Sequence, residues 1–298
     1  MRYIPAKSIV IRKPISDEWF ACDFNMNIYK GCSHGCIYCD SRSECYHVDN
    51  FEEIRAKENA LQTIEKELRG KRKKGVIGTG SMSDPYNSKE VKYRLTRGAL
   101  ELINKYKFGV NVITKSSLIT RDIDIYQNIA QHSPVCTKLT ITTYDDELCQ
   151  KIEPHVAPTS KRLNTLRELS EAGLFTGVVV MPLLPYINDD EQNLIALVNA
   201  IAETGAKFIY LQQGVTLRQN QREYFYEQLG RLFSGVKEKY ERSFKMMYQC
   251  TSPNALRLWQ VFTDLCKKHK LLYKMGDINA AYKSFGSGQS IPIQTSLF

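Results

Sequence analysis

Short runs of apolar and β-branched residues alternate with amphipathic stretches through the middle of the chain. Six such runs predict strands at Asn25–Tyr29, Gly75–Thr79, Gly109–Thr114, Lys138–Thr142, Gly177–Met181 and Phe208–Gln212. Between them apolar residues recur at helical spacing, which predicts helices at Glu52–Leu68, Lys92–Tyr106, Asp122–Gln131, Ser160–Ala172 and Glu191–Thr204.

This alternation predicts parallel βαβ units joined by right-handed crossovers, and therefore an α/β fold. Six repeats are two short of a complete eight-stranded barrel. The pattern alone leaves two arrangements open, a curved and partly open barrel or a doubly wound sheet.

The last part of the chain has a different pattern. Three consecutive stretches predict helices at Arg222–Phe233, Val236–Tyr248 and Pro253–His269. We expect this region to pack on the barrel rather than to form an independent domain. The expected organisation is an N-terminal extension (1–24), a barrel (25–215), a helical C-terminal region (216–285) and a flexible tail (286–298).

Composition places the protein among ordinary globular chains. Its 298 residues are 43% hydrophobic and 24% charged, which supports a sizeable core. No stretch approaches the roughly 18 apolar residues of a membrane span, and the first residues lack the apolar segment of a signal peptide. We expect a cytoplasmic protein without membrane association.

The net charge of +9 is concentrated toward the C-terminus. Residues 231–298 contain eleven Lys or Arg against four Asp or Glu, and a second basic cluster lies at Arg69–Lys74. Basic faces attract nucleic acid and other polyanions. Solvated helix surfaces explain the charge equally well, so charge alone decides nothing.

The cysteines carry the strongest chemical signal. There are nine, and Cys32, Cys36 and Cys39 form a Cys-x3-Cys-x2-Cys motif directly after the first predicted strand. An odd count with this crowding is a poor disulfide framework. Three thiolates hold three irons of a cubane cluster and leave the fourth iron open to a small ligand.

A structural zinc site is the alternative. Such sites are closed by four ligands, and Cys45, His47 or Cys22 would supply the fourth. The spacing of the three cysteines fits a single cluster-binding loop better than the paired knuckles of a zinc site.

Further motifs follow the predicted strands in order. They are Ser83-Asp84-Pro85-Tyr86, Thr114-Lys115, Glu153-Pro154 with Arg162-Leu163, and a Pro-x-x-Pro-x-x-Asn-Asp segment from Pro182 to Asp189. Together with the cysteine motif, they make the chain resemble the radical S-adenosylmethionine (SAM) superfamily, and within it the spore photoproduct lyase-related branch. The resemblance implies a partial (β/α)6 TIM-type barrel with a C-terminal helical extension.

The resemblance also implies cofactors and chemistry. A [4Fe–4S] cluster on Cys32, Cys36 and Cys39 would bind SAM, cleave it reductively and release a 5′-deoxyadenosyl radical that abstracts hydrogen from a substrate. The protein would then be an enzyme, a lyase or a modifying enzyme, supplied with electrons by a low-potential donor such as flavodoxin or ferredoxin.

Six residues are implied as SAM contacts. Tyr38 would lie beside the adenine, Ser83 would bind the methionine end or the ribose, and Lys115 would neutralise the methionine carboxylate. Thr142 is preferred to Thr140 on the same strand because it lies nearer the mouth. Arg162 and Asn188 complete the set. A salt bridge or helix cap explains Glu153, Arg162, Asn188 and Asp189 nearly as well.

Two departures separate the chain from spore photoproduct lyase itself. Ser81 stands where that enzyme has a hydrogen-donating cysteine, and Asp40 stands where it has a tyrosine. A serine O–H bond is too strong to replace a thiol as a hydrogen donor. Cys136 is badly placed for that role, while Cys45 or Cys22 could lie near the mouth. No catalytic residue is assigned.

The chain ends in Gln294-Thr295-Ser296-Leu297-Phe298. This resembles the short peptide by which bacterial DNA repair proteins dock on the sliding clamp, with Thr295 in place of the usual leucine. The alternative is that Leu297 and Phe298 pack on the protein's own surface.

Three functions compete. The first is a radical enzyme that acts on nucleic acid, in DNA repair or base modification, and the basic C-terminal region and the tail favour DNA. The second is a radical enzyme for a peptide or small molecule; beyond the barrel only Cys250 and Cys266 remain, too few for a further four-thiolate cluster. The third is a non-catalytic, metal-stabilised adaptor for DNA or the clamp.

Overall fold

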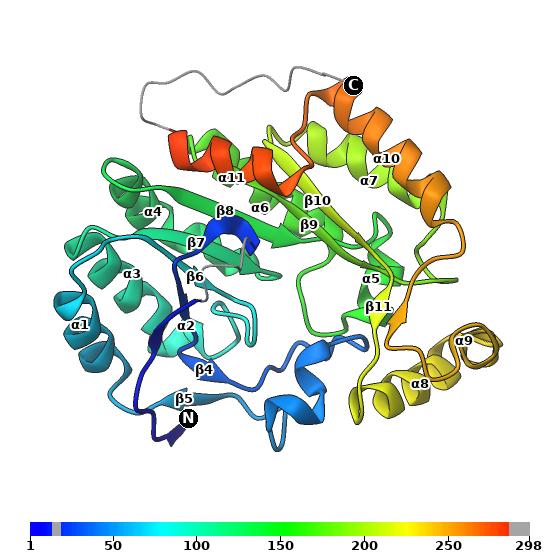
Figure 1. Ribbon diagram of the computed structural model, residues 1–298, viewed down its shortest axis with the longest axis horizontal. Coiled ribbons are helices and arrows are strands. Elements are labelled where there is room, and N and C mark those ends of the chain that lie inside the picture. Colours follow the sequence, from blue (N-terminus) through cyan, green and yellow to red (C-terminus); the bar gives the residue numbers. More distant parts are fainter. Residues whose placement is uncertain (14–18, 286–298) are drawn as a thin grey trace.

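The computed structural model describes residues 1–13 and 19–285. A seven-stranded sheet crosses its centre in the order β10-β9-β8-β7-β6-β3-β2 (Figure 1). Six strands pair in parallel, and β2 (Val10–Arg12) adds an antiparallel edge beside β3. The parallel strands are β3 (Phe24–Met26), β6 (Val76–Thr79), β7 (Gly109–Thr114), β8 (Val135–Thr140), β9 (Thr176–Leu183) and β10 (Phe208–Gln213). The predicted α/β fold with a largely parallel sheet is confirmed.

Helices connect the parallel strands and pack on the sheet (Figure 1). Amphipathic sequence explains them, because each buries one apolar stripe against the strands. The five longest are α1 (Ala60–Gly70), α3 (Leu95–Lys105), α4 (Ile123–Ala130), α6 (Thr159–Glu171) and α7 (Glu191–Ala202). Shorter turns are η1 (Trp19–Ala21), η2 (Asp40–Arg42), η3 (Glu44–Tyr46), α2 (Glu90–Tyr93), η4 (Ser117–Asp122) and α5 (Asp146–Ile152).

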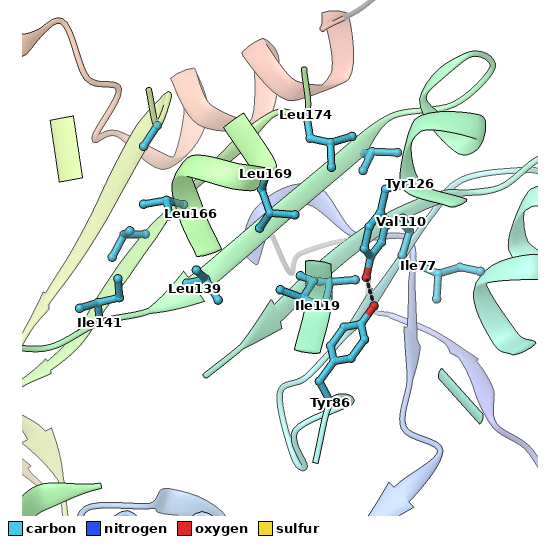
Figure 2. Close-up of a cluster of buried hydrophobic side chains, with 14 of the residues drawn as sticks. Ile77, Tyr86, Val110, Ile119, Tyr126, Leu139, Ile141, Leu166, Leu169 and Leu174 are labelled. Carbon is cyan, nitrogen blue, oxygen red and sulfur yellow. Dashed lines mark hydrogen bonds between the residues drawn. The ribbon is translucent and has the colours of Figure 1, made fainter. Parts of the chain in front are cut away.

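The main core lies between the sheet and these helices. Figure 2 shows Val110 and Leu139 of the sheet with Leu166 and Leu169 of α6, all fully buried. Each such aliphatic side chain contributes about 1.5–3 kcal/mol by leaving water. β9 is a nearly continuous apolar run and is buried along almost its whole length, as is typical of a parallel strand that is covered on both faces.

Two elements predicted in the first part of the chain are arranged differently in the structure. The helix predicted from Glu52 starts only at α1, because Arg55–Lys57 forms strand β5 in a small sheet with β1 (Arg2–Ile4) and β4 (Tyr29–Lys30). The strand predicted at Asn25–Tyr29 is therefore divided between β3 in the main sheet and β4 in the small one. Arg55 and Ala56 are buried in a strand of only three residues, too short to give a period-two signal.

The C-terminal part contributes α8 (Gln221–Leu232), α9 (Val236–Phe244), α10 (Ala255–His269), α11 (Met275–Ser284) and the short ribbon of β11 (Val215–Thr216) and β12 (Gln249–Cys250). The α10 stripe of Leu258, Phe262 and Cys266 joins the main core, and α10 packs on α7 (Figure 1). The unpredicted α11 covers aromatic residues near the amino ends of β8 to β10, and its Tyr282 donates a 2.7 Å hydrogen bond to the carbonyl of Phe20.

No helix in the described ranges is both long and apolar enough to cross a membrane. The predicted flexible tail and the clamp-like peptide Gln294–Phe298 lie outside the described residues.

Candidate active site

The cysteine loop follows β4 and is tied to the neighbouring chain. The Cys32 N–H donates to the carbonyl of Phe51 at 2.8 Å, and Ser83 Oγ donates to the carbonyl of Gly31 at 2.6 Å. Gly31 has φ of 82°, and a Cβ there would collide with the carbonyl oxygens of Glu53 and Phe51. Only glycine fits this entrance to the loop.

A cavity of about 440 Å³ opens beside this loop, at the carboxyl ends of the parallel strands. Parallel α/β proteins bind their ligands at this edge of the sheet. Six of the residues predicted for cluster or SAM binding line the cavity, while Thr142, Arg162 and Asn188 do not. The six are Cys32, Cys36, Cys39, Tyr38, Ser83 and Lys115.

The thiols that line the cavity are largely buried. Burial raises the pKa of Cys32 to about 11 and also raises that of Cys36. An apolar setting of this kind keeps a thiol protonated and inert, whereas a metal binds the thiolate and displaces the proton. The two cysteines therefore suit a metal centre better than nucleophilic chemistry.

The thiol arrangement bears on the kind of metal centre. Among residues 1–13 and 19–285, no three His, Cys, Asp or Glu side chains converge closely enough to hold a single metal ion. A structural zinc site needs four such ligands around one ion. A cubane cluster spreads its three thiolates over three irons, so cysteines placed around one cavity fit it.

Lys115 supplies a positive charge to the cavity. Its ammonium lies 5.6 Å from the ring centre of Tyr38. Burial alone would lower the pKa of Lys115, but Cys36 and Glu153 outweigh burial and raise it. Within the described part of the chain this ammonium forms no ion pair of 4.0 Å or less. A charged group of this kind suits an anionic ligand such as a carboxylate.

Asp84 fixes the position of Lys115. Its carboxylate accepts hydrogen bonds from Thr114 Oγ1 at 2.6 Å and from the Lys115 N–H at 2.8 Å. It also lies 3.6 Å from Nδ1 of His34, within the cysteine loop. The Ser83–Tyr86 motif therefore joins three parts of the site, namely the cysteine loop, the end of β6 and the end of β7.

A buried polar network supports Tyr38 from outside the cavity. The hydroxyl of Tyr38 donates to Glu153, and Arg162 Nη2 donates to the same carboxylate at 2.6 Å. Arg162 also donates to the carbonyl of Thr140, at 2.6 Å. The salt bridge that the sequence analysis gives as the alternative role of Glu153 and Arg162 is present. Arg162 therefore lies behind the cavity wall and reaches the wall residue Tyr38 through Glu153.

Thr142 and Asn188 lie together beyond the end of β8. Asn188 Nδ2 donates to the carbonyl of Thr142 at 2.7 Å, and its Oδ1 accepts from the Leu184 N–H at 2.5 Å. The side chains hold two loops together. Thr140, the neighbour that the sequence ranks lower, lines the cavity instead. β8 ends at Thr140, so the strand alternation that linked the two threonines stops there.

Comparison with known proteins decides the family. The sequence profile of the Radical SAM superfamily matches residues 26–198, from β3 into α7. The chain belongs to the radical SAM superfamily. It is a radical SAM enzyme, and membership implies a [4Fe–4S] cluster and SAM as cofactors.

Relatives of this radical SAM enzyme occur in bacteria, archaea and a virus. An uncharacterized protein of Mycobacterium tuberculosis is 28% identical over 74% of this chain and 67% of its own length. One of Methanocaldococcus jannaschii is 31% identical, over 61% and 69%. One of Acidianus two-tailed virus is 24% identical, over 80% and 85%.

Solved structures of radical SAM enzymes share the fold. A variant of spore photoproduct lyase aligns over 90% of this chain and 79% of its own, with a TM-score of 0.67 and 14% identity. The lyase complexed with dinucleoside spore photoproduct gives 0.66 at 14%. A methyltransferase from Kitasatospora setae, with cobalamin and a [4Fe–4S] cluster bound, gives 0.55 at 13% over 88% of this chain and 56% of its own.

The rim of the radical SAM cavity contains Arg218 and Tyr248, two residues that the sequence analysis did not single out. Arg218 donates to Tyr248 Oη at 2.8 Å and to Cys45 Sγ at 3.1 Å, and lies 3.5 Å from Asp40. Tyr248 and Asp40 line the cavity, as does Ser81. Arg218 carries no motif, and its link to Asp40 spans the chain, so no local pattern could reveal it.

The remaining thiols lie off the cavity wall. Cys45 is exposed at the rim, whereas Cys22 and Cys136 are buried with Phe20 and the aromatic residues under α11. Among the described residues, the only thiols on the wall are those of the three motif cysteines. The structure therefore offers no further cysteine in contact with the cavity.

Proposed function

We propose that this enzyme cleaves SAM in the cavity and directs the resulting radical to a nucleic-acid substrate, in repair or modification of DNA. The observation that carries the proposal is the convergence of Cys32, Cys36, Cys39, Ser83 and Lys115 on one cavity. No other described cavity combines three cysteines with a buried cation.

The chemistry comes from the cofactors. Cys32, Cys36 and Cys39 would hold a [4Fe–4S] cluster. Reduced by a donor such as flavodoxin or ferredoxin, it would supply the one electron that cleaves SAM into methionine and a 5′-deoxyadenosyl radical, and this radical would take a hydrogen atom from substrate. The protein supplies binding, orientation and exclusion of water.

Each side chain has a proposed task. Lys115 pairs with the methionine carboxylate, Ser83 bonds the methionine end or the ribose, and Tyr38 borders the adenine. Arg162 acts through Glu153 on Tyr38 and is a positioning residue. Thr142 and Asn188 act in the same indirect way by holding the loops behind the wall.

Charge and fold similarity support nucleic acid as the substrate class. The chain has a net charge of +9, concentrated after residue 231 in the region that includes the Tyr248 rim. Polyanions bind such surfaces with a strong salt dependence. Spore photoproduct lyase, which shares the fold, has been seen with a dinucleoside photoproduct.

The residues of the cavity wall argue against the reaction of spore photoproduct lyase itself. Ser81, which the sequence resemblance aligns with that enzyme's hydrogen-donating cysteine, lines the cavity. Among the described residues, no thiol other than those of the three motif cysteines lines it. Any substrate radical formed here must therefore be resolved without a cysteine at that position. Modification, or repair of a different lesion, fits this wall better.

Deuterium transfer tests the substrate class. The reconstituted enzyme is given SAM, a reductant and uniformly deuterated DNA without oxygen, and 5′-deoxyadenosine is analysed by mass spectrometry. Deuterium in the product supports nucleic acid. Product that stays unlabelled with DNA and becomes labelled with a deuterated peptide mixture would favour the peptide reaction instead.

Docking on the sliding clamp through Gln294–Phe298 stays a separate prediction. Deletion of these residues should abolish clamp binding, and Thr295→Leu should strengthen it. If clamp binding is the same as wild type in both variants, the prediction that this peptide docks on the clamp is wrong.

A further inference from the structure

An exposed apolar loop lies at the rim of the cavity. Met246, Met247 and Tyr248, between α9 and β12, are 81%, 56% and 50% exposed. Tyr248 also lines the cavity in which we place SAM. Exposed apolar side chains that adjoin each other at an active site mark an interaction surface.

The loop is held in one conformation. Arg222 is buried, and its guanidinium donates to the carbonyls of Lys245 at 3.0 Å, Met246 at 3.4 Å and Met247 at 2.7 Å. Three carbonyls of consecutive residues thus share one cation. The apolar side chains are presented to solvent by a fixed backbone, so binding there costs little ordering entropy.

The turn at the start of the loop is specific. The Met247 N–H donates to the carbonyl of Phe244 at 2.7 Å, and Lys245 between them has φ of 47°. This backbone conformation is unfavourable for any residue other than glycine. It also ends α9 at Phe244, four residues before the helix end that the sequence predicts.

The loop is connected to the cavity by the β11–β12 ribbon. Val215 pairs with Cys250 and Thr216 with Gln249, directly after Tyr248. Val215 and Thr216 both line the cavity. Anything that packs on Met246 and Met247 while reaching past Tyr248 therefore extends into the proposed radical site.

The surroundings of the loop are basic. Residues 231–248 contain five Lys or Arg and two Glu. Arg242 and Lys245 are exposed, and neither forms an ion pair within the described residues. A surface that combines apolar side chains with available cations is complementary to nucleic acid, in which stacked bases lie between phosphates.

We infer that the Lys245–Tyr248 loop is a preformed wedge for nucleic acid: Met246 and Met247 fill the space left by an unstacked base, and Tyr248 borders that base as it enters the cavity. This rests on the proposed function. A base inside a duplex cannot reach an enclosed site without leaving its stack, and apolar wedges of this kind stabilise the unstacked form. Arg242 and Lys245 contact the flanking phosphates.

The test uses the reconstituted enzyme and a short DNA duplex that contains 2-aminopurine, a base whose fluorescence rises when it unstacks. Affinity is measured by fluorescence anisotropy at several salt concentrations. Met246→Ser/Met247→Ser should bind roughly ten-fold more weakly, with an unchanged salt dependence and little unstacking signal. Arg242→Gln/Lys245→Gln should lower the salt slope by about two.

Leu256→Ser is the matched control, because Leu256 is 90% exposed on α10 and absent from the cavity wall. It should behave as wild type. Wild-type affinity and unstacking in the Met246→Ser/Met247→Ser variant would overturn the wedge while leaving the proposed function in place. A wild-type enzyme without salt-dependent DNA binding would overturn both. Preference for a polyglutamate peptide, lost in the same variant, would assign the loop to a protein partner.

Discussion

Arg162 and Glu153 form a fully buried ion pair, with 2.6 Å between Nη2 and Oε2, and the same carboxylate accepts the hydrogen bond of Tyr38 between two cysteines of the cluster motif. Removal of Arg162 would leave the buried carboxylate of Glu153 without its cationic partner. Arg162→Met should therefore cost about 3–5 kcal/mol of unfolding free energy. The double variant Glu153→Gln/Arg162→Met should recover most of that loss.

Urea denaturation measures the free energy of unfolding of the wild type, Arg162→Met, Glu153→Gln and the double variant, which together form a double-mutant cycle. Equal stability of Arg162→Met and wild type would show that the ion pair has no structural role. A double variant as unstable as Arg162→Met would show that the unpaired charge is not the cause.

The same carboxylate gives the fold an acid sensitivity. Burial alone would raise the pKa of Glu153, but Arg162 and Lys115 outweigh it and hold it below the ordinary value of about 4.3. A depressed pKa adds stability that is present above the unfolded-state value and is lost as the pH falls through the folded-state value. Between pH 7 and acid, wild type should lose more stability than Glu153→Gln/Arg162→Met, with the difference appearing below about pH 4.

Stability profiles of the two proteins against pH provide the measurement. Other carboxylates titrate equally in both, so only the difference between the profiles reports on Glu153. Parallel profiles would contradict the depressed pKa.

Gly31 should be essential for the cysteine loop. In Gly31→Ala the new Cβ meets two carbonyl oxygens at a residue whose φ is 82°. The loop must shift, so reconstituted iron per chain should fall severalfold. Gly70→Ala is the control, because a Cβ there meets nothing within 4 Å. Full iron content in Gly31→Ala would show that the loop entrance is not constrained as described.

Lys115 should set the affinity for SAM. Loss of one charge-assisted hydrogen bond costs about 1.5–3 kcal/mol, so Lys115→Met should bind SAM roughly ten- to a hundred-fold more weakly. Lys115→Arg should retain part of the affinity. The exposed Lys92→Met serves as control. Calorimetry without oxygen measures all four proteins, and unchanged affinity in Lys115→Met would remove this residue from the site.

The strands and the cysteine loop were predictable from sequence because their signals are local. The predicted bounds of β7 match the structure, since four of the six residues of Gly109–Thr114 are β-branched and the run lies between turns. Lys115 was predicted to lie at the cavity because it directly follows a strand, and parallel strands bring their carboxyl ends together. Ser83 was predicted through the family resemblance of the Ser83–Tyr86 motif.

The residues that escaped prediction depend on distant partners. Thr140 rather than Thr142 faces the cavity because β8 ends there, and strand ends are the least certain feature of a sequence pattern. Tyr248 reaches the rim because Arg222 and the β11 pairing redirect the chain after α9. Neither contact leaves a periodic signal, since the partners lie more than twenty residues apart.

The most direct test of the account is reductive cleavage of SAM. The protein is reconstituted with iron and sulfide without oxygen, reduced, given SAM and assayed for 5′-deoxyadenosine. We predict product that disappears in Cys36→Ala and persists in Cys45→Ser, whose thiol is exposed and off the cavity wall. A colourless protein that binds one zinc ion and forms no 5′-deoxyadenosine would contradict the account.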